Sequence, residues 1–136
     1  MTTPAEPPFL ALDFVYMPSR DAAADLAHFT DVLGARAVFA VEGMGTRVAM
    51  VELSPSAPAI LLAEHLEGDR PVLVYRVADL AAAMRELESR GWKRGAQLEI
   101  PHGPVCSFET PGGQRLAIYQ LSRPDVAEPF AGRRDF

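Results

Sequence analysis

The chain has 136 residues, 49% of them hydrophobic and 23% charged, which predicts one globular domain with enough apolar side chains for a core. Thirteen Lys and Arg against eighteen Asp and Glu give a net charge of -5, so the broad basic surface that nucleic acid or anionic lipid requires is missing. No apolar run approaches the ~18 residues that span a bilayer, and Met1–Pro8 lacks the features of a signal peptide, so we expect a cytoplasmic protein with small-molecule partners. Cys106 is the single cysteine, which excludes an internal disulfide and a cysteine-cluster zinc site.

Two parts of the chain share one pattern at an offset of about 57 residues. The turn and strand at 54–64 align with those at 110–120, and the strand entering Asp21 aligns with the strand entering Asp79. Gly34 and Gly91 stand at the same offset, each where a helix is expected to end. The sequence therefore predicts two modules of the same topology.

The first module begins with a strand around Phe14–Tyr16 and continues into a helix that Ser19 or Asp21 caps. Apolar side chains of this helix, among them Leu26, recur at helical spacing. Three strands are expected after it, at residues 36–42, 46–53 and 59–65.

The second module repeats this order from a strand at Val72–Val74. Asp79 caps its helix, and an i, i+3, i+4, i+7 apolar stripe starts at Leu80. The strands expected after this helix lie at 92–99, 105–109 and 115–121. Each half therefore has the order βαβββ, and the fold class is α+β.

Four segments in this order resemble the vicinal oxygen chelate superfamily, which includes glyoxalase I, extradiol dioxygenases and bleomycin-resistance proteins. They are Pro18–Asp21, Asp31–Gly34, Val77–Leu80 and Thr110–Tyr119. The resemblance implies one domain over 9–122, built from modules at about 9–65 and 71–122. These modules form incomplete, cupped mixed sheets with the helices on the outer face. Residues 1–8 are then a flexible arm and 123–136 a C-terminal tail that straps a subunit, covers a cleft mouth or protects a sheet edge.

In metal-using members, the resemblance implies ligands on the first and last strand of each module. Counted from the landmarks above, these positions are Phe14, Leu61, Val72 and Ala117. A divalent cation needs imidazole, carboxylate or thiolate donors, and hydrocarbon side chains offer none. We therefore expect no metal and no other cofactor. A one-residue shift in register would add only the Asp13 carboxylate.

The alternation along the strands predicts an apolar concave face with a few polar tips. Such a lining suits a planar ligand on which tyrosine rings can stack. If the ligand is anionic, an arginine can pair with its charged group. The expected ligand-binding residues are Phe14, Tyr16, Leu61, His65, Val72, Arg76, Ala117 and Tyr119.

Several of these residues also have ordinary structural interpretations. Arg76 is as well placed for an ion pair with Glu52 or Glu64 as for a ligand, and Arg115 follows a turn where solvent is expected. A metal site formed by His65, His102 and a glutamate such as Glu99 is a further alternative, because the sequence does not give the distances between strands.

The main functional prediction is a metal-free small-molecule binding protein of the glyoxalase and bleomycin-resistance type, expected to form a homodimer. The alternative is an enzyme of the same superfamily. It would be a metal-dependent lyase, isomerase or dioxygenase, or a metal-free enzyme that uses His65 and a tyrosine.

Overall fold

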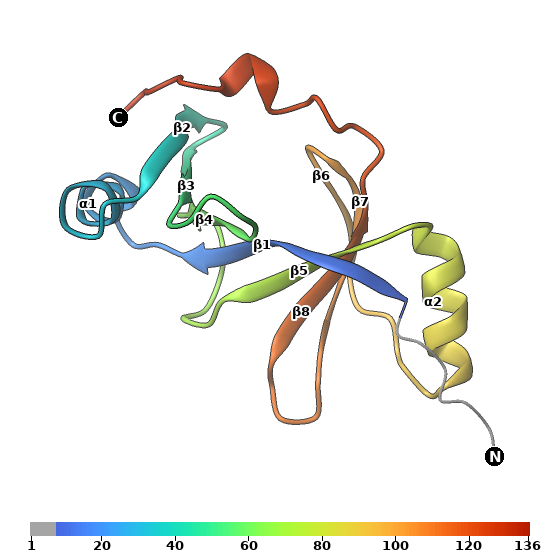
Figure 1. Cartoon of the computed structure of the whole chain (residues 1–136). Coiled ribbons are helices and arrows are strands. Elements are labelled where there is room, and N and C mark those ends of the chain that lie inside the picture. The colour runs from blue at the N-terminus through green and yellow to red at the C-terminus, as the bar shows by residue number, and fades with distance from the viewer. Residues whose placement is uncertain (1–7) are drawn as a thin grey trace.

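The structure is a computed structural model, and residues 8–136 are described; the predicted arm falls almost wholly outside them. The first half of the chain has the predicted order of one strand, a helix and three further strands (Figure 1). Its elements are β1 (Phe9–Pro18), α1 (Ala22–Ala27), a π-helical segment (His28–Val32), β2 (Arg36–Gly43), β3 (Thr46–Glu52) and β4 (Ala59–Ala63). The second half comprises β5 (Val72–Val77), α2 (Leu80–Ser89), β6 (Gln97–Ile100), β7 (Gly103–Glu109), β8 (Arg115–Gln120) and a short 3-10 turn (Glu128–Phe130).

The described strands form one mixed sheet of eight strands in the order β2-β3-β4-β1-β5-β8-β7-β6. Within each half the first strand runs parallel to the last, as β1 does to β4 and β5 to β8. The halves join where β1 and β5 pair antiparallel, so the two modules associate within one chain. The result is an α+β fold of two tandem βαβββ modules in a curled sheet, as the sequence predicted.

Both helices begin at the predicted aspartates. The Asp21 side chain accepts a hydrogen bond from the backbone N–H of Ala24 at 3.1 Å, and that of Asp79 from Ala82 at 3.0 Å. Ser19, the other candidate cap, instead donates its hydroxyl to Asp25 at 2.5 Å.

The first helix differs from the prediction in its second half. The α-helical hydrogen bonds end at Ala27, and a π-helical segment follows up to Val32. The hydroxyl of Thr30 donates to the carbonyl of Leu26 at 3.0 Å, which places a side chain in competition with the backbone ladder. Gly34, with φ +77°, then reverses the chain as expected.

The first strand after α2 begins later than predicted, at Gln97 instead of Trp92. Trp92 leaves the helix to pack edge-on against Phe108, with ring centroids 5.4 Å apart. Gly95 then passes so close to β7 that a Cβ there would lie 2.0 Å from the carbonyl oxygen of Ser107. Regular pairing starts only after this approach.

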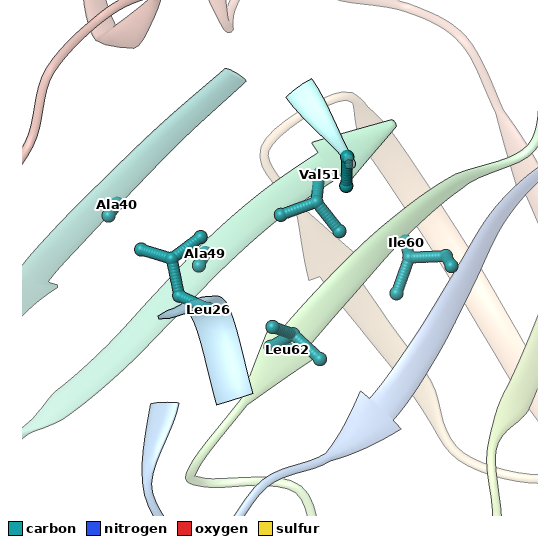
Figure 2. Packing of buried hydrophobic residues seen from close by; sticks show 7 residues of the cluster. Leu26, Ala40, Ala49, Val51, Ile60 and Leu62 are labelled. Carbon is teal, nitrogen blue, oxygen red and sulfur yellow. The ribbon is translucent and has the colours of Figure 1, made fainter. Parts of the chain in front are cut away.

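Each helix covers an apolar cluster on the outer face of the sheet. Leu26 of α1 is 1% exposed and points onto Ala49 and Leu62 of the strands beneath it (Figure 2). On α2, Leu80, Ala83, Met84 and Leu87 pack the same way over Cys106 and Ile118. Since these side chains occupy alternate strand positions, the residues between them face the concave side.

The C-terminal tail lies along the edge of β2 (Figure 1). The N–H of Ala40 donates to the carbonyl of Arg133 at 2.8 Å, and the N–H of Asp135 donates to the carbonyl of Ala40 at 2.7 Å. Phe130 packs against Phe39 on the concave face, and Phe136 joins the cluster under α1. Of the three interpretations offered for the tail, protection of a sheet edge is the one that this arrangement matches.

No helix in residues 8–136 is both long enough and apolar enough to cross a membrane.

Candidate functional site

The strand register places the predicted binding residues on the concave face. Tyr16 lies opposite Leu61 of β4 and Val72 of β5. Phe14 lies opposite Val74, and Val74 in turn lies opposite Ala117 of β8. Phe14 and Tyr16 both pack against two adjoining apolar clusters, one in each module. Only His65 falls outside a strand, just beyond the end of β4.

The four positions that the resemblance assigned to metal ligands carry hydrocarbon side chains. Phe14 packs against the clusters that contain Leu61, Val72 and Ala117, so the four positions come together as the resemblance implied. Phenyl, isobutyl, isopropyl and methyl groups have no lone pair to give a cation, and this centre therefore does not fit a metal. Nowhere in residues 8–136 do three or more His, Cys, Asp or Glu side chains gather as a metal site, the combination of His65, His102 and Glu99 included.

A cleft of about 610 Å³ opens on the concave side of the second module. Val72, Val74, Val105 and Ala117 form an apolar wall, with Leu66 and Ile100 beside them. Of the predicted binding residues, Tyr16, His65, Val72 and Ala117 line this cleft. Phe14, Leu61, Arg76 and Tyr119 do not line it, because they lie nearer the seam between the modules or in the first module.

Tyr16 is the aromatic residue of β1 that faces the cleft. Burial raises the pKa of its phenol from 10.0 to about 12, so the hydroxyl keeps its proton at neutral pH. No protein group in residues 8–136 accepts a hydrogen bond from it, which leaves this hydroxyl available to a ligand.

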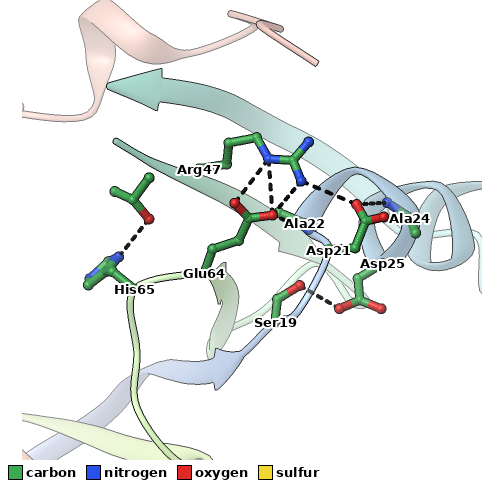
Figure 3. A network of polar contacts seen from close by, with 9 residues as sticks. Ser19, Asp21, Ala22, Ala24, Asp25, Arg47, Glu64 and His65 are labelled. Atoms are coloured by element: carbon green, nitrogen blue, oxygen red, sulfur yellow. Dashed lines mark hydrogen bonds and ion pairs between the residues drawn. The ribbon is translucent and has the colours of Figure 1, made fainter. Parts of the chain in front are cut away.

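His65 lies at the mouth of the cleft and is exposed. Its Nδ1 is 3.3 Å from the hydroxyl of Thr46 (Figure 3). Beside it, Glu64 points away from the cleft toward Arg47, whose Nη2 lies 2.5 Å from Oε2. Glu64 also accepts the backbone N–H of Ala22 at 2.8 Å, so it fixes the start of α1. The hydrogen bond from Arg47 lowers the pKa of Glu64 and keeps it ionised.

A polar cluster of Asp13, Tyr119 and Arg76 lies at the seam between the modules. The hydroxyl of Tyr119 donates to Oδ2 of Asp13, and Nε of Arg76 lies 3.4 Å from the same oxygen. Tyr119 is 1% exposed, and burial followed by the Asp13 hydrogen bond raises the pKa of its phenol. Of the two alternatives for Arg76, an ion pair is present, but its partner is Asp13 of the neighbouring strand β1 instead of Glu52 or Glu64.

Asp13 was missed as a concave residue because strict alternation assigns it to the outer face. The pairing of β1 with β5 is irregular between Leu12 and Phe14, and this bulge lets both Asp13 and Phe14 turn inward. An aspartate inside an apolar strand is the signal that could have indicated it, since such a carboxylate needs a partner.

His102 belongs to the turn before β7 and packs against Phe14, with ring centroids 4.9 Å apart. Burial lowers its pKa, although the nearby Asp13 carboxylate opposes this shift. The histidine is therefore neutral at physiological pH and serves as a packing residue here.

Arg115 holds the linker between the modules in place. Its Nη1 donates to the carbonyl oxygens of Glu67 at 2.8 Å and Arg70 at 2.9 Å. Arg70 in turn donates to the carbonyl of Gly113 at 3.0 Å. These contacts fix residues 66–70 as one side of the cleft mouth, whereas the sequence predicted a solvated side chain.

Cys106 is fully buried beneath α2. Burial raises the pKa of its thiol, which keeps the sulfur protonated and unreactive.

Solved structures resemble this chain in fold. The methylmalonyl-CoA epimerase from Mycobacterium tuberculosis superposes with a TM-score of 0.72, covering 92% of this chain and 97% of its own at 21% identity. A methylmalonyl-CoA epimerase variant from Streptomyces coelicolor in complex with 2-nitronate-propionyl-CoA gives 0.67, with 85% and 96% covered at 13% identity. A methylmalonyl-CoA epimerase in complex with methylmalonyl-CoA and NH4+ gives 0.65, with 85% and 96% covered at 12% identity. No protein-family model and no curated protein sequence matches the chain.

The sheet order and these neighbours together define the fold as that of the vicinal oxygen chelate superfamily. The methylmalonyl-CoA epimerases named above share this fold with the chain at 12–21% identity.

Proposed function

We propose that this chain binds a small, planar, mostly apolar molecule in the cleft of its second module, without a metal ion. The observation that carries this proposal is the hydrocarbon at Phe14, Leu61, Val72 and Ala117 beside an apolar cleft of about 610 Å³. Ligand pockets of about 300–1,000 Å³ usually combine an apolar lining with a few polar groups. Tyr16 provides a ring for stacking and a hydroxyl for orientation.

Metal analysis and ligand screening test this proposal together. Protein purified without chelator is analysed for transition metals, and less than about 0.1 metal ion per chain is expected because the donors are missing. Planar aromatic compounds are then screened by thermal shift, where a ligand at 100 times its Kd adds about 2.7 kcal/mol of stability. One tightly held metal per chain, or no stabilising compound in the screen, would contradict the proposal.

The second candidate is an enzyme of the same superfamily, and the names of the structural neighbours support it better than they support a binding protein. The metal-dependent form of this alternative lacks its donors at Phe14, Leu61, Val72 and Ala117, and residues 8–136 gather no other metal-binding group. The metal-free form has His65 and Tyr16 on one cleft. In an epimerisation, His65 would take the proton from the carbon next to a carbonyl, and Tyr16 would donate a hydrogen bond to the enolate oxygen that forms. Return of the proton to the other face completes the reaction.

Solvent exchange distinguishes the two candidates. The protein is incubated with methylmalonyl-CoA in D2O, and deuterium entry at the carbon between the two carbonyl groups is followed by NMR. An enzyme of this kind would give exchange above the uncatalysed rate, lost in His65→Gln and kept in His28→Gln, since His28 is exposed in the π-helical segment and does not line the cleft. Equal exchange with and without protein would leave binding as the function.

The homodimer and the cytoplasmic location remain predictions. Light scattering tests the first, since one chain has a mass of 14.8 kDa and a dimer has twice that.

A further inference from the structure

Both arginines considered as partners for an anionic ligand make contacts within the protein. Arg76 pairs with Asp13 and does not line the cleft. Arg115 lines the cleft, but its Nη1 is shared between the carbonyl oxygens of Glu67 and Arg70. These two hydrogen bonds hold the guanidinium against the linker, so only its Nε–Nη2 edge is left for a carboxylate or phosphate.

The mouth of the cleft carries more negative than positive charge. Glu67 and Glu109 both line it and are exposed, and neither carboxylate forms an ion pair within residues 8–136. A smaller hollow of about 390 Å³ shares this mouth. Its charged lining residues are the acids Glu67, Asp69 and Glu109 and the bases Arg70 and Arg115. An anion entering here therefore meets an excess of negative charge.

Among its apolar neighbours in the cleft, Tyr16 offers a hydroxyl to a ligand. It lies among Val72, Val74 and Ala117 and has no protein acceptor in the described part of the chain. Because burial keeps the phenol protonated, the hydroxyl acts as a hydrogen-bond donor at neutral pH. A ligand that places a carbonyl oxygen there satisfies a donor that is otherwise left to water.

We propose that the cleft selects an uncharged aromatic ligand bearing a carbonyl-type acceptor for Tyr16, and that it disfavours anions such as acyl-CoA esters. This inference rests on the proposed small-molecule binding and specifies the ligand class for the same cleft. It applies to binding and to catalysis alike, since both need the ligand to pass Glu67 and Glu109.

Three planar probes of nearly equal size test the proposal by isothermal titration calorimetry at pH 7: 2-naphthamide, 2-naphthoate and naphthalene. We expect 2-naphthamide to bind about tenfold more tightly than the isosteric 2-naphthoate, because only the anion is repelled at the mouth. We expect Tyr16→Phe to weaken 2-naphthamide about tenfold and to leave naphthalene within about twofold, because only the amide carries an acceptor.

A double variant tests the effect of the negative charges at the cleft mouth. The double substitution Glu67→Gln and Glu109→Gln removes both carboxylates at exposed positions, so the fold is kept and 2-naphthoate should gain about threefold to tenfold, while 2-naphthamide stays unchanged. The matched control Glu86→Gln lies on the exposed side of α2 and should alter neither probe.

Two outcomes overturn the inference in different ways. If 2-naphthoate binds as tightly as 2-naphthamide to the unmodified protein, the cleft does not disfavour anions, although small-molecule binding stands. If no probe binds at millimolar concentration, the proposed binding function fails together with this inference.

Discussion

The polar cluster at the seam allows a quantitative prediction about stability. Tyr119→Phe removes the hydroxyl that donates to Asp13, while the carboxylate keeps Arg76 and 17% of its side-chain surface in contact with solvent. Hydrogen bonds to charged groups contribute about 1.5–3 kcal/mol, so we expect a loss of about 2 kcal/mol in the free energy of unfolding.

Asp13→Ala should cost more, about 3 kcal/mol, because it leaves two partners behind. Tyr119 is 1% exposed, so its hydroxyl cannot turn to water, and Arg76 Nε is already without a hydrogen bond of good geometry. In the double variant Asp13→Ala with Tyr119→Phe, the stranded hydroxyl is gone. Its cost should therefore fall about 1–2 kcal/mol below the sum of the two single costs.

Urea unfolding at pH 7, followed by Trp92 fluorescence, measures all four corners of this cycle. Tyr75→Phe is the matched control, since Tyr75 lies on the outer face against Phe9 and makes no hydrogen bond through its hydroxyl in residues 8–136. It should stay within about 0.5 kcal/mol of the unmodified protein. The inward position of Asp13 would be refuted if the stability losses of the two single variants simply add up in the double variant. It would also be refuted if Tyr119→Phe lost no more stability than the control Tyr75→Phe.

Three further predictions concern the rest of the fold. Burial raises the pKa of Tyr16 from 10.0 to about 12, so the stabilisation that the neutral phenol contributes is full below pH 10 and is lost, by about 3 kcal/mol, as the pH rises through 12. Urea unfolding measured over this pH range should therefore show a smaller loss of unfolding free energy for Tyr16→Phe than for the unmodified protein. An identical loss in both proteins would contradict the buried phenol. Leu26→Ala should lower the unfolding free energy by about 2–5 kcal/mol in the same assay, because the side chain is 1% exposed under α1, and a loss below about 1 kcal/mol would argue against that packing. Deleting residues 131–136 should cost roughly 3 kcal/mol and increase self-association in light scattering, since it uncovers the edge of β2; an unchanged oligomeric state and stability would count against the tail contacts.

Much of the fold was readable because the chain repeats its own local chemistry. Asp21 and Asp79 cap their helices through the same side-chain interaction, and the alternation along β5 and β8 correctly separates the concave Val72 and Ala117 from the residues under α2. These features depend on near neighbours in sequence and on a period of two, which a single sequence carries.

The errors in the site arose from features that depend on tertiary contact. The bulge that turns Asp13 inward is set by the pairing of β1 with β5, and no alternation pattern contains it. The delayed start of β6 follows from the close approach of Gly95 to β7, and the partners of Arg115 lie more than forty positions away in the chain. The sequence therefore indicated the face of the sheet that matters and could not indicate which polar groups on it are free.

Phe130 makes the two copies of the repeat unequal. In the first module its ring packs against Phe39 on the concave face, with ring centroids 6.2 Å apart, whereas the concave side of the second module holds the cleft. The first module is therefore filled by packing contacts, while the second module keeps the open surface on which lining residues can change. Substitutions that line the cleft of the second module can change which ligand binds with little loss of stability. Substitutions around Phe39 mainly change the packing of the first module.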